Sequence, residues 1–155
     1  MAEKILVTGG TGYIGSHTTV ELIEKGYETV IIDNLCNSST DALKGIREIT
    51  GTEPSFELFN LCEYDKLREC CKKHKNIKAV IHFAALKAVG ESVEKPLEYY
   101  RNNLVSLMNL LCAMKEFHIP ALVFSSSCTV YGEPDKLPVT EESPVKSASS
   151  PYGNT

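Results

Sequence analysis

The sequence has no tryptophan, few methionines and no apolar run long enough to span a bilayer. Its N-terminus leads directly into an apolar segment and shows no signal-peptide pattern. The formal net charge is −4, and the basic residues are scattered, so no basic face suggests nucleic-acid binding. These absences predict a cytoplasmic protein with no membrane partner and no nucleic-acid partner.

The sequence also lacks the cysteine spacing of a metal site or a disulfide framework. Its six cysteines contain no C-x-x-C pair, and its four histidines are dispersed along the chain. We therefore expect no metal, and we interpret the cysteines as small buried or half-buried thiols. A chain of 155 residues is large enough to fold without such cross-links, so we expect one domain over residues 1–155.

A glycine-rich turn is the most informative feature that is present. Residues 5–7 predict a short strand buried on both faces, and a helical pattern begins at Tyr13. Gly9, Gly12 and Gly15 are spaced three apart, so the turn lacks Cβ atoms where a phosphate must approach main-chain N–H groups. The first N–H groups of the helix and its dipole also favour an anion. We expect the pyrophosphate of a dinucleotide here.

An acidic residue follows the next expected strand. Residues 29–32 are apolar and end at Asp33, where an acidic side chain meets the adenosine ribose in dinucleotide-binding folds. A carboxylate accepts hydrogen bonds from both ribose hydroxyls and repels a 2′-phosphate, and the neighbouring Asn34 is not basic. NAD is therefore favoured over NADP. The alternative is a glycine turn beside a solvated aspartate.

Strand and helix patterns alternate along the rest of the chain. Further strands are expected at residues 56–61, 79–84 and 121–124, and helices over residues 41–50, 63–74, 96–117 and from Pro151 onward. The expected apolar faces are Ile14, Thr18, Leu22 and Ile23 in the first helix, and Leu97, Tyr100, Leu104, Leu107, Met108 and Leu111 in the longest. The alternation predicts an α/β fold, a Rossmann-like doubly wound parallel sheet with helices on both faces.

Polar or small residues follow several of these strands, at the edge where such sheets bind ligands. They are the polar turn at residues 34–39, Asn60 with Leu61, Ala84 with Ala85, one of Asn102 and Asn103, and the hydroxyls at residues 125–127. Asn60 and Leu61 would offer adenine a polar contact and an apolar wall, or they simply end a strand. The hydroxyls signal a site, or they form a serine-rich turn.

Five segments together carry a resemblance to a known family: VTGGTGYIGSHT, IIDNLCNS, HFAALKAVGESVEKPLEYY, FSSSCTVYG and SPYG. These segments resemble those of the UDP-glucose 4-epimerases, which belong to the extended short-chain dehydrogenase/reductase family. The resemblance covers the whole chain. Proteins of that family continue with a nucleotide-sugar-binding domain, so we expect an N-terminal piece, truncated before the substrate domain. The lysine of the family's Tyr-x-x-x-Lys pair would come directly after Thr155.

The resemblance implies an NAD-dependent interconversion of UDP-glucose and UDP-galactose through a 4-keto intermediate. It implies that Tyr152 is the base for the 4-hydroxyl proton and that Ser127 hydrogen-bonds the same oxygen. The candidate cofactor-binding residues are Gly9, Gly12, Tyr13, Ile14, Gly15, Asp33, Asn34, Leu35, Cys36, Asn37, Ser38, Asn60, Leu61, Phe83, Ala84, Ala85, Leu86, Lys87, Asn102, Ser125 and Tyr152. The whole protein is expected to be a homodimer.

The missing lysine predicts little or no epimerase activity for this chain alone, because a phenol is a poor base unless positive charge stabilises the phenolate. An apolar sheet edge or face left uncovered by truncation also predicts self-association.

Three positions depart from the family's usual residues. Asn60 replaces an aspartate, Ala85 a glycine and Cys128 an alanine. Cys128 and Thr129 also stand where dehydratases of the same superfamily have an acidic pair, which disfavours dehydration. The alternatives left open are a uronate epimerase or decarboxylase and a non-catalytic NAD-binding module.

Overall fold

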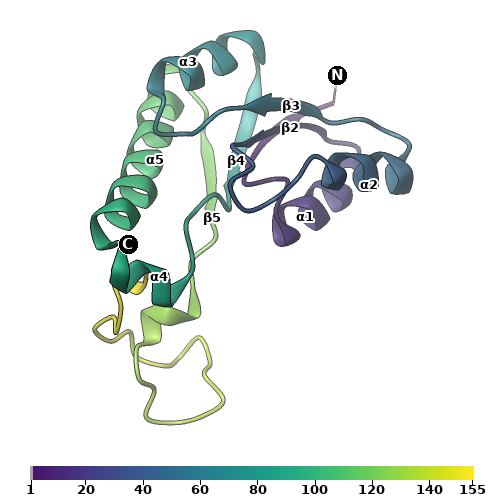
Figure 1. Cartoon of the computed structure of the whole chain (residues 1–155). Coiled ribbons are helices and arrows are strands. Elements are labelled where there is room, and N and C mark those ends of the chain that lie inside the picture. The colour runs from purple at the N-terminus through teal and green to yellow at the C-terminus, as the bar shows by residue number, and fades with distance from the viewer. Residues whose placement is uncertain (1) are drawn as a thin grey trace. The chain divides into compact units, whose positions relative to one another are not determined.

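The structure is a computed structural model that describes residues 2–155, and its centre is a parallel five-stranded sheet (Figure 1). The strands are β1 (Lys4–Thr8), β2 (Glu28–Asp33), β3 (Ser55–Leu58), β4 (Ile77–His82) and β5 (Ala121–Phe124). Their order is β3-β2-β1-β4-β5, and all neighbours are parallel. The order reverses between β1 and β4, which is the switch point where doubly wound sheets bind ligands. The predicted Rossmann-like fold is confirmed.

Five helices and two short 3₁₀ turns accompany the sheet in the described residues. They are α1 (Tyr13–Glu24), α2 (Asp41–Thr50), α3 (Tyr64–Lys73), α4 (Val89–Glu94), α5 (Pro96–Glu116), η1 (Cys128–Tyr131) and η2 (Tyr152–Asn154). Gly51 closes α2 in the left-handed conformation. Neither α4 nor η1 was expected from the sequence. None of the helices in residues 2–155 is long and apolar enough to cross a membrane.

The described chain forms two compact units. The first contains the residues up to Ala84 together with Ser106–Ser125, and so includes the whole sheet, α1 to α3 and the second part of α5. The second contains Ala85–Val105 and Ser126–Thr155, and so includes α4, the first part of α5, η1 and η2.

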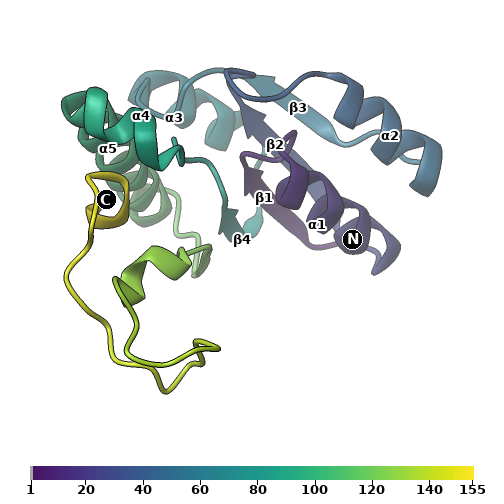
Figure 2. The same cartoon turned by 60° about the horizontal axis from the view of Figure 1, so that its bottom comes forward.

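The sheet of the first unit is covered on both faces, with α1 and α2 on one side and α3 and α5 on the other (Figure 2). Leu6, Val30 and Val80 are fully buried and pack with Leu67 of α3 and Leu110 of α5. Each such side chain stabilises the fold by about 1.5–3 kcal/mol relative to its exposed state. This core holds the strand ends in fixed positions.

Two predicted strand ends are wrong by two or three residues. β3 ends at Leu58 and β4 at His82, because the register of β3 with β2 stops at Asp33 and that of β4 with β1 stops at Thr8. The candidate residues after these strands therefore lie in turns and not within the sheet.

The predicted apolar face of α1 is wrong at its first residue, Ile14, whereas Thr18, Leu22 and Ile23 are half-buried. Ile14 is 56% exposed, and the residues that α1 buries are Gly15 and Thr19. A Cβ atom on Gly15 would collide with the carbonyl oxygen of Gly9. The helix approaches the glycine turn so closely that its contact face must be nearly free of side chains.

The predicted apolar face of α5 is wrong. Leu97 is 82% exposed, and Leu104, Met108 and Leu111 are exposed as well. The residues buried along this helix are Tyr99, Asn103, Ser106, Leu110, Ala113 and Met114. Both sets have helical spacing, and the buried set includes polar side chains with hydrogen-bond partners inside the protein.

Candidate functional site

Gly9, in the glycine turn between β1 and α1, has no room for a side chain. Gly9 has φ of 69°, and a Cβ atom on it would lie 2.8 Å from the Ala84 nitrogen. Its N–H donates to the Ile32 carbonyl of β2 at 2.8 Å, and the Gly12 N–H donates to the Gly9 carbonyl at 3.1 Å. The turn is therefore fixed against β2 and against the chain that follows β4.

The start of α1 presents main-chain donors to solvent. Its N-cap residue is Gly12, and no side-chain hydrogen bond caps the helix there. Tyr13 is 79% exposed and its ring meets the His17 ring edge-to-face, with ring centroids 4.9 Å apart. Unsatisfied N–H groups at the start of a twelve-residue helix are suited to binding an anion. This geometry fits a pyrophosphate.

Asp33 ends β2 with its carboxylate held by neutral donors. Its Oδ1 accepts from the Leu35 N–H at 2.9 Å and from the Ser38 hydroxyl at 3.3 Å. Its Oδ2 accepts from the Thr11 N–H at 3.2 Å. A half-buried carboxylate with three neutral donors can accept from one further hydroxyl, as the adenosine ribose would supply.

The turn after Asp33 is built from local hydrogen bonds. Leu35 lies in the left-handed region with φ of 58°, which is uncommon for leucine. The Cys36 N–H donates to the Asn34 side chain at 3.1 Å, and Asn34, Cys36 and Asn37 are exposed. These residues lie together with Asp33 at the carboxyl end of β2.

Asn60 and Leu61 lie in the turn that follows β3. Leu61 is 4% exposed and packs in the hydrophobic core, so its side chain offers no open apolar wall to an adenine. Asn60 is half-buried and its Oδ1 accepts from the Cys62 N–H at 2.8 Å. The turn buries Leu61 because α3 and α5 need an apolar residue beneath them, a tertiary requirement that no local pattern reveals.

A buried histidine that the sequence did not single out fastens the ends of β1 and β4. The Thr8 hydroxyl lies 2.6 Å from His82 Nδ1, and the Ala84 N–H donates to the same hydroxyl oxygen at 3.4 Å. Burial lowers the pKa of His82 to about 4, so the ring is neutral at neutral pH. The hydrogen bond between the neutral His82 ring and the Thr8 hydroxyl fixes the chain that Gly9 packs against.

In the second unit, the η1 turn orients the Ser127 hydroxyl. Its oxygen accepts from the Thr129 N–H at 3.3 Å and from the Thr129 hydroxyl at 3.0 Å. Both bonds use the oxygen as acceptor, so the single proton of Ser127 stays available to donate. This is the property required of a hydroxyl that stabilises a reacting oxygen.

The η2 turn of the same unit carries Tyr152 next to η1. The Ser150 hydroxyl accepts from the Gly153 N–H at 3.1 Å and so stabilises the predicted start of this turn. A Cβ on Gly153 would lie 3.2 Å from the Cβ of Thr129. The turns that carry Ser127 and Tyr152 are therefore in direct contact, and a hydroxyl donor and a phenol are a suitable pair for moving a proton.

Asn103 links two candidate segments of the second unit. Its Oδ1 accepts from the Leu86 N–H at 2.9 Å, and its Nδ2 donates to the Leu86 carbonyl and to the Thr155 hydroxyl, each at 2.9 Å. The Thr155 hydroxyl donates in turn to the Tyr152 carbonyl at 2.9 Å. Of the two asparagines considered from the sequence, the buried Asn103 holds protein segments in place, and Asn102 is half-buried.

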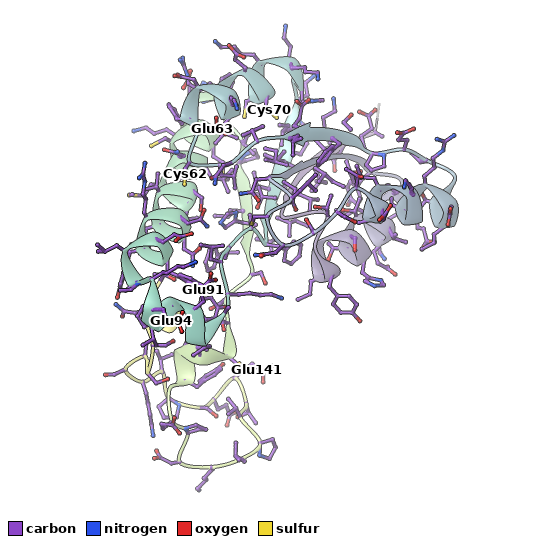
Figure 3. The ribbon with its side chains drawn as sticks, in the orientation of Figure 1. Cys62, Glu63, Cys70, Glu91, Glu94 and Glu141 are labelled. Carbon is purple, nitrogen blue, oxygen red and sulfur yellow. The ribbon has the colours of Figure 1, made fainter. Side chains whose placement is uncertain are left out.

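A tyrosine and a glutamate hold α4 against the first part of α5. The Tyr99 hydroxyl, on a side chain that is 1% exposed, donates to Glu91 at 2.8 Å and accepts from the Ala88 N–H at 3.2 Å. Burial and the Glu91 charge raise the pKa of Tyr99. Glu91 and Glu94 both lie on α4 (Figure 3). The segment from Leu86 to Glu91 is therefore bonded to α5 at both ends, by Asn103 at Leu86 and by Tyr99 at Glu91.

The cysteines are free thiols in two classes. Cys70 of α3, labelled in Figure 3, and Cys71 are buried, and burial raises their pKa values to about 12 and about 11. Cys36, Cys112 and Cys128 are exposed, which corrects the expectation that all are buried or half-buried. No group of three or more histidine, cysteine or acidic side chains within residues 2–155 is placed to bind a metal.

Comparison with known proteins gives a consistent result. A family profile described as "NAD dependent epimerase/dehydratase family" matches residues 5–155. A UDP-glucose 4-epimerase of Dictyostelium discoideum is 52% identical over 99% of this chain, and one of Bacillus subtilis (strain 168) is 52% identical over 97%. In both cases the match covers 44% of the relative, so this chain spans less than half of its relatives' length.

Solved structures agree with this result. A UDP-glucose 4-epimerase from Bifidobacterium longum in complex with NAD+ and UDP has a TM-score of 0.93 and 46% identity, covering 97% of this chain and 45% of that one. A Stenotrophomonas maltophila enzyme with bound NAD and formylated UDP-arabinopyranose has a TM-score of 0.91 and 45% identity, covering 98% of this chain and 45% of that one.

Proposed function

Since the chain belongs to the NAD dependent epimerase/dehydratase family, we propose that it is the cofactor-binding part of an enzyme that interconverts UDP-glucose and UDP-galactose. One observation carries this proposal: almost the whole chain, and not the glycine turn alone, is about half identical to UDP-glucose 4-epimerases. Cys128 and Thr129 supply no carboxylic acid for the elimination that a dehydratase performs. Epimerisation is therefore favoured over dehydration.

The described residues fit NAD. Gly9 and Gly15 have no space for a Cβ atom, α1 begins without a side-chain cap, and Asp33 has only neutral partners among its hydrogen bonds. We propose that Gly9, Gly12, Tyr13, Ile14 and Gly15 hold the pyrophosphate. The other proposed contacts are Asp33 to Ser38, Asn60, Phe83 to Lys87, Asn102, Ser125 and Tyr152, and the main chain of Leu61. Bound there, NAD supplies the reversible hydride acceptor that inversion at C4 requires.

The roles proposed for the second unit concern the sugar's 4-oxygen. Tyr152 takes the proton of the 4-hydroxyl and later returns it, and Ser127 donates a hydrogen bond to the same oxygen. The two bonds from Thr129 support this role because they occupy the acceptor sites of the Ser127 oxygen and leave its proton free to donate. Asn103 and Thr155 hold the main chain of Tyr152 in place.

We propose further that residues 1–155 are an NAD-binding domain and that most contacts to the UDP-sugar belong to the length that the relatives have in addition. On this basis the chain alone binds NAD but shows little or no turnover of UDP-galactose, and the whole protein is cytoplasmic. Calorimetric titration of the chain with NAD, followed by an assay with UDP-galactose, tests both statements. Turnover at the rate of a full-length relative would refute the second.

A chimaera separates an epimerase from a non-catalytic NAD-binding module. The chain is placed in the Bacillus subtilis relative in place of the matching residues, which are 52% identical. We expect this chimaera to convert UDP-galactose and its Tyr152→Phe variant to be at least about a hundredfold slower, since general acid–base groups contribute about 10²–10⁴-fold. A folded chimaera that binds NAD but does not respond to UDP-galactose would favour the binding module.

Self-association and a homodimeric whole protein are also proposed. β5 is an edge strand of the sheet, with Val123 58% and Phe124 48% exposed. The opposite edge strand, β3, carries Glu57 paired with Lys73 at 2.7 Å, a charged arrangement that discourages pairing between chains. A second copy of the chain is the proposed occupant of the β5 edge. Sedimentation that shows only monomer at high concentration would refute this self-association.

A further inference from the structure

Thr11 has a buried hydroxyl that phosphate binding does not explain. It lies inside the glycine turn, between Gly9 and Gly12, and is only 5% exposed. Binding of a pyrophosphate by main-chain N–H groups requires no side chain at this position. The hydroxyl is nevertheless hydrogen-bonded, 2.7 Å from the hydroxyl oxygen of Ser38.

The same residue reaches Asp33 by a second route. The Thr11 N–H donates to Asp33 Oδ2 at 3.2 Å, and the Ser38 hydroxyl donates to Asp33 Oδ1 at 3.3 Å. Thr11, Ser38 and Asp33 therefore form a closed ring of three residues, and each contacts the other two. The ring joins the glycine turn to the segment after β2.

Counting protons gives the ring a direction. The hydroxyl of Ser38 has one proton, and the ionised carboxylate of Asp33 can only accept. Ser38 therefore donates its only hydroxyl proton to Asp33. In the hydrogen bond between the two hydroxyls, Thr11 must then be the donor and Ser38 the acceptor. Removing the Thr11 hydroxyl leaves the Ser38 oxygen without a donor and frees Ser38 to rotate away from Asp33.

We propose that Thr11 is a positioning residue for Asp33 and, through Ser38, sets the preference of this site for NAD over NADP. The inference depends on the proposed binding of NAD. A fixed carboxylate presents its remaining lone pair, on Oδ2, to a ribose hydroxyl and repels a 2′-phosphate at short range. A carboxylate that can rotate into solvent accepts a ribose hydroxyl less often and repels a 2′-phosphate less strongly. Loss of the Thr11 hydroxyl therefore weakens NAD binding and reduces the discrimination against NADP.

The test compares two valine variants of equal burial. Thr11→Val replaces the hydroxyl by a methyl of similar shape, and Thr29→Val makes the same change at a β2 residue that is also 5% exposed. The Thr29 hydroxyl has no hydrogen-bond partner within the described residues 2–155, so this control loses a buried hydroxyl but no bond. Thr11→Ser, which keeps the hydroxyl, is the rescuing variant.

Dissociation constants for NAD and NADP are measured by calorimetry on the 155-residue chain. In Thr11→Val we expect NAD to bind about two- to tenfold more weakly, the range of one net hydrogen bond, with the NAD-to-NADP preference reduced by a similar factor. Thr29→Val and Thr11→Ser are expected to keep the unmodified preference. Ser38→Ala, at a half-buried position, provides the same measurement if Thr11→Val does not fold.

The outcomes are distinguishable. An unmodified chain that binds neither dinucleotide refutes the proposed site and the inference together. An unmodified chain that prefers NAD, with Thr11→Val showing an unchanged preference or equal loss for both dinucleotides, refutes the role of Thr11 alone. A lowered preference in Thr29→Val as well would also refute it, because the effect would then follow from any buried hydroxyl.

Discussion

The two units hold their candidate segments by opposite means. In the first unit the glycine turn is shaped by the absence of side chains, since Cβ atoms on Gly9 and Gly15 would collide with the main chain. In the second unit the turns are shaped by side chains, with Asn103 and Thr155 bonding the main chain of Leu86 and Tyr152. The first arrangement is therefore sensitive to added atoms and the second to removed ones.

The largest effect is expected from adding one methyl group to the turn. Gly15→Ala places a Cβ against the Gly9 carbonyl, and backbone must move to relieve the collision. We expect urea denaturation to show a loss of more than about 3 kcal/mol in the free energy of unfolding, with loss of NAD binding. The matched control is Gly45→Ala in α2, where no atom lies within 4 Å of the added Cβ. It should gain about 0.5–1 kcal/mol, and equal losses in both variants would contradict a steric origin.

A pH titration tests whether the first unit also depends on a polar contact. Burial lowers the folded-state pKa of His82 from 6.5 to about 4, so the unfolded chain takes up a proton first as the pH falls. The stability due to the neutral ring is thus complete above pH 6.5 and is lost as the pH falls toward 4, by about 3 kcal/mol in all. His82→Asn keeps an acceptor for Thr8 and should remove this slope. Denaturation curves with the same pH dependence in both proteins would contradict the prediction.

The second unit should lose stability when Asn103 is truncated. Asn103→Ala leaves the main-chain groups of Leu86 and the Thr155 hydroxyl without these bonds, at a cost of about 2–3 kcal/mol. Hydrogen exchange of the Leu86 amide should accelerate as its acceptor is removed. Asn109→Ala, which breaks one bond to the Leu61 carbonyl, is the control and should leave Leu86 exchange unchanged. Equal exchange rates of the Leu86 amide in the Asn103 and Asn109 variants would contradict the proposed role of Asn103 in holding Leu86.

The smallest effect is expected where a buried hydroxyl has no bond to lose. Among residues 2–155 the Thr29 hydroxyl is the buried side-chain polar atom without a partner. Thr29→Val should therefore raise the free energy of unfolding by about 1 kcal/mol, because an unsatisfied group is removed from the core. Thermal denaturation checks this value, and a loss of stability would show that the hydroxyl is satisfied in solution.

Sequence reasoning succeeded where local pattern determines structure. The glycine spacing, the strand before it and Asp33 are all encoded within one βαβ unit, so the doubly wound fold follows from them and is confirmed. The resemblance to UDP-glucose 4-epimerases is confirmed as well, and NAD dependence is confirmed for the family to which the chain belongs. The roles of individual site residues stay predictions.

Sequence reasoning failed where contacts between distant segments determine which residues are buried. The exposed set that includes Leu97 and the buried set that includes Tyr99 and Asn103 both recur at helical intervals, and only their partners on other segments distinguish the two faces. The six residues of α4 are too few to show a period, and they include Gly90. Asn103 was recognised as a polar interruption, but its bonds to Leu86 and Thr155 cannot be inferred from sequence spacing.

The two bonds between Asn103 and Leu86 involve only the peptide groups of Leu86. Nearly any amino acid at position 86 would therefore preserve them, and proline would not, since it has no N–H to donate. A substitution at position 86 other than proline is therefore expected to leave the path of the polypeptide unchanged. The Leu86 side chain can therefore change without loss of these two bonds, whereas Asn103 cannot.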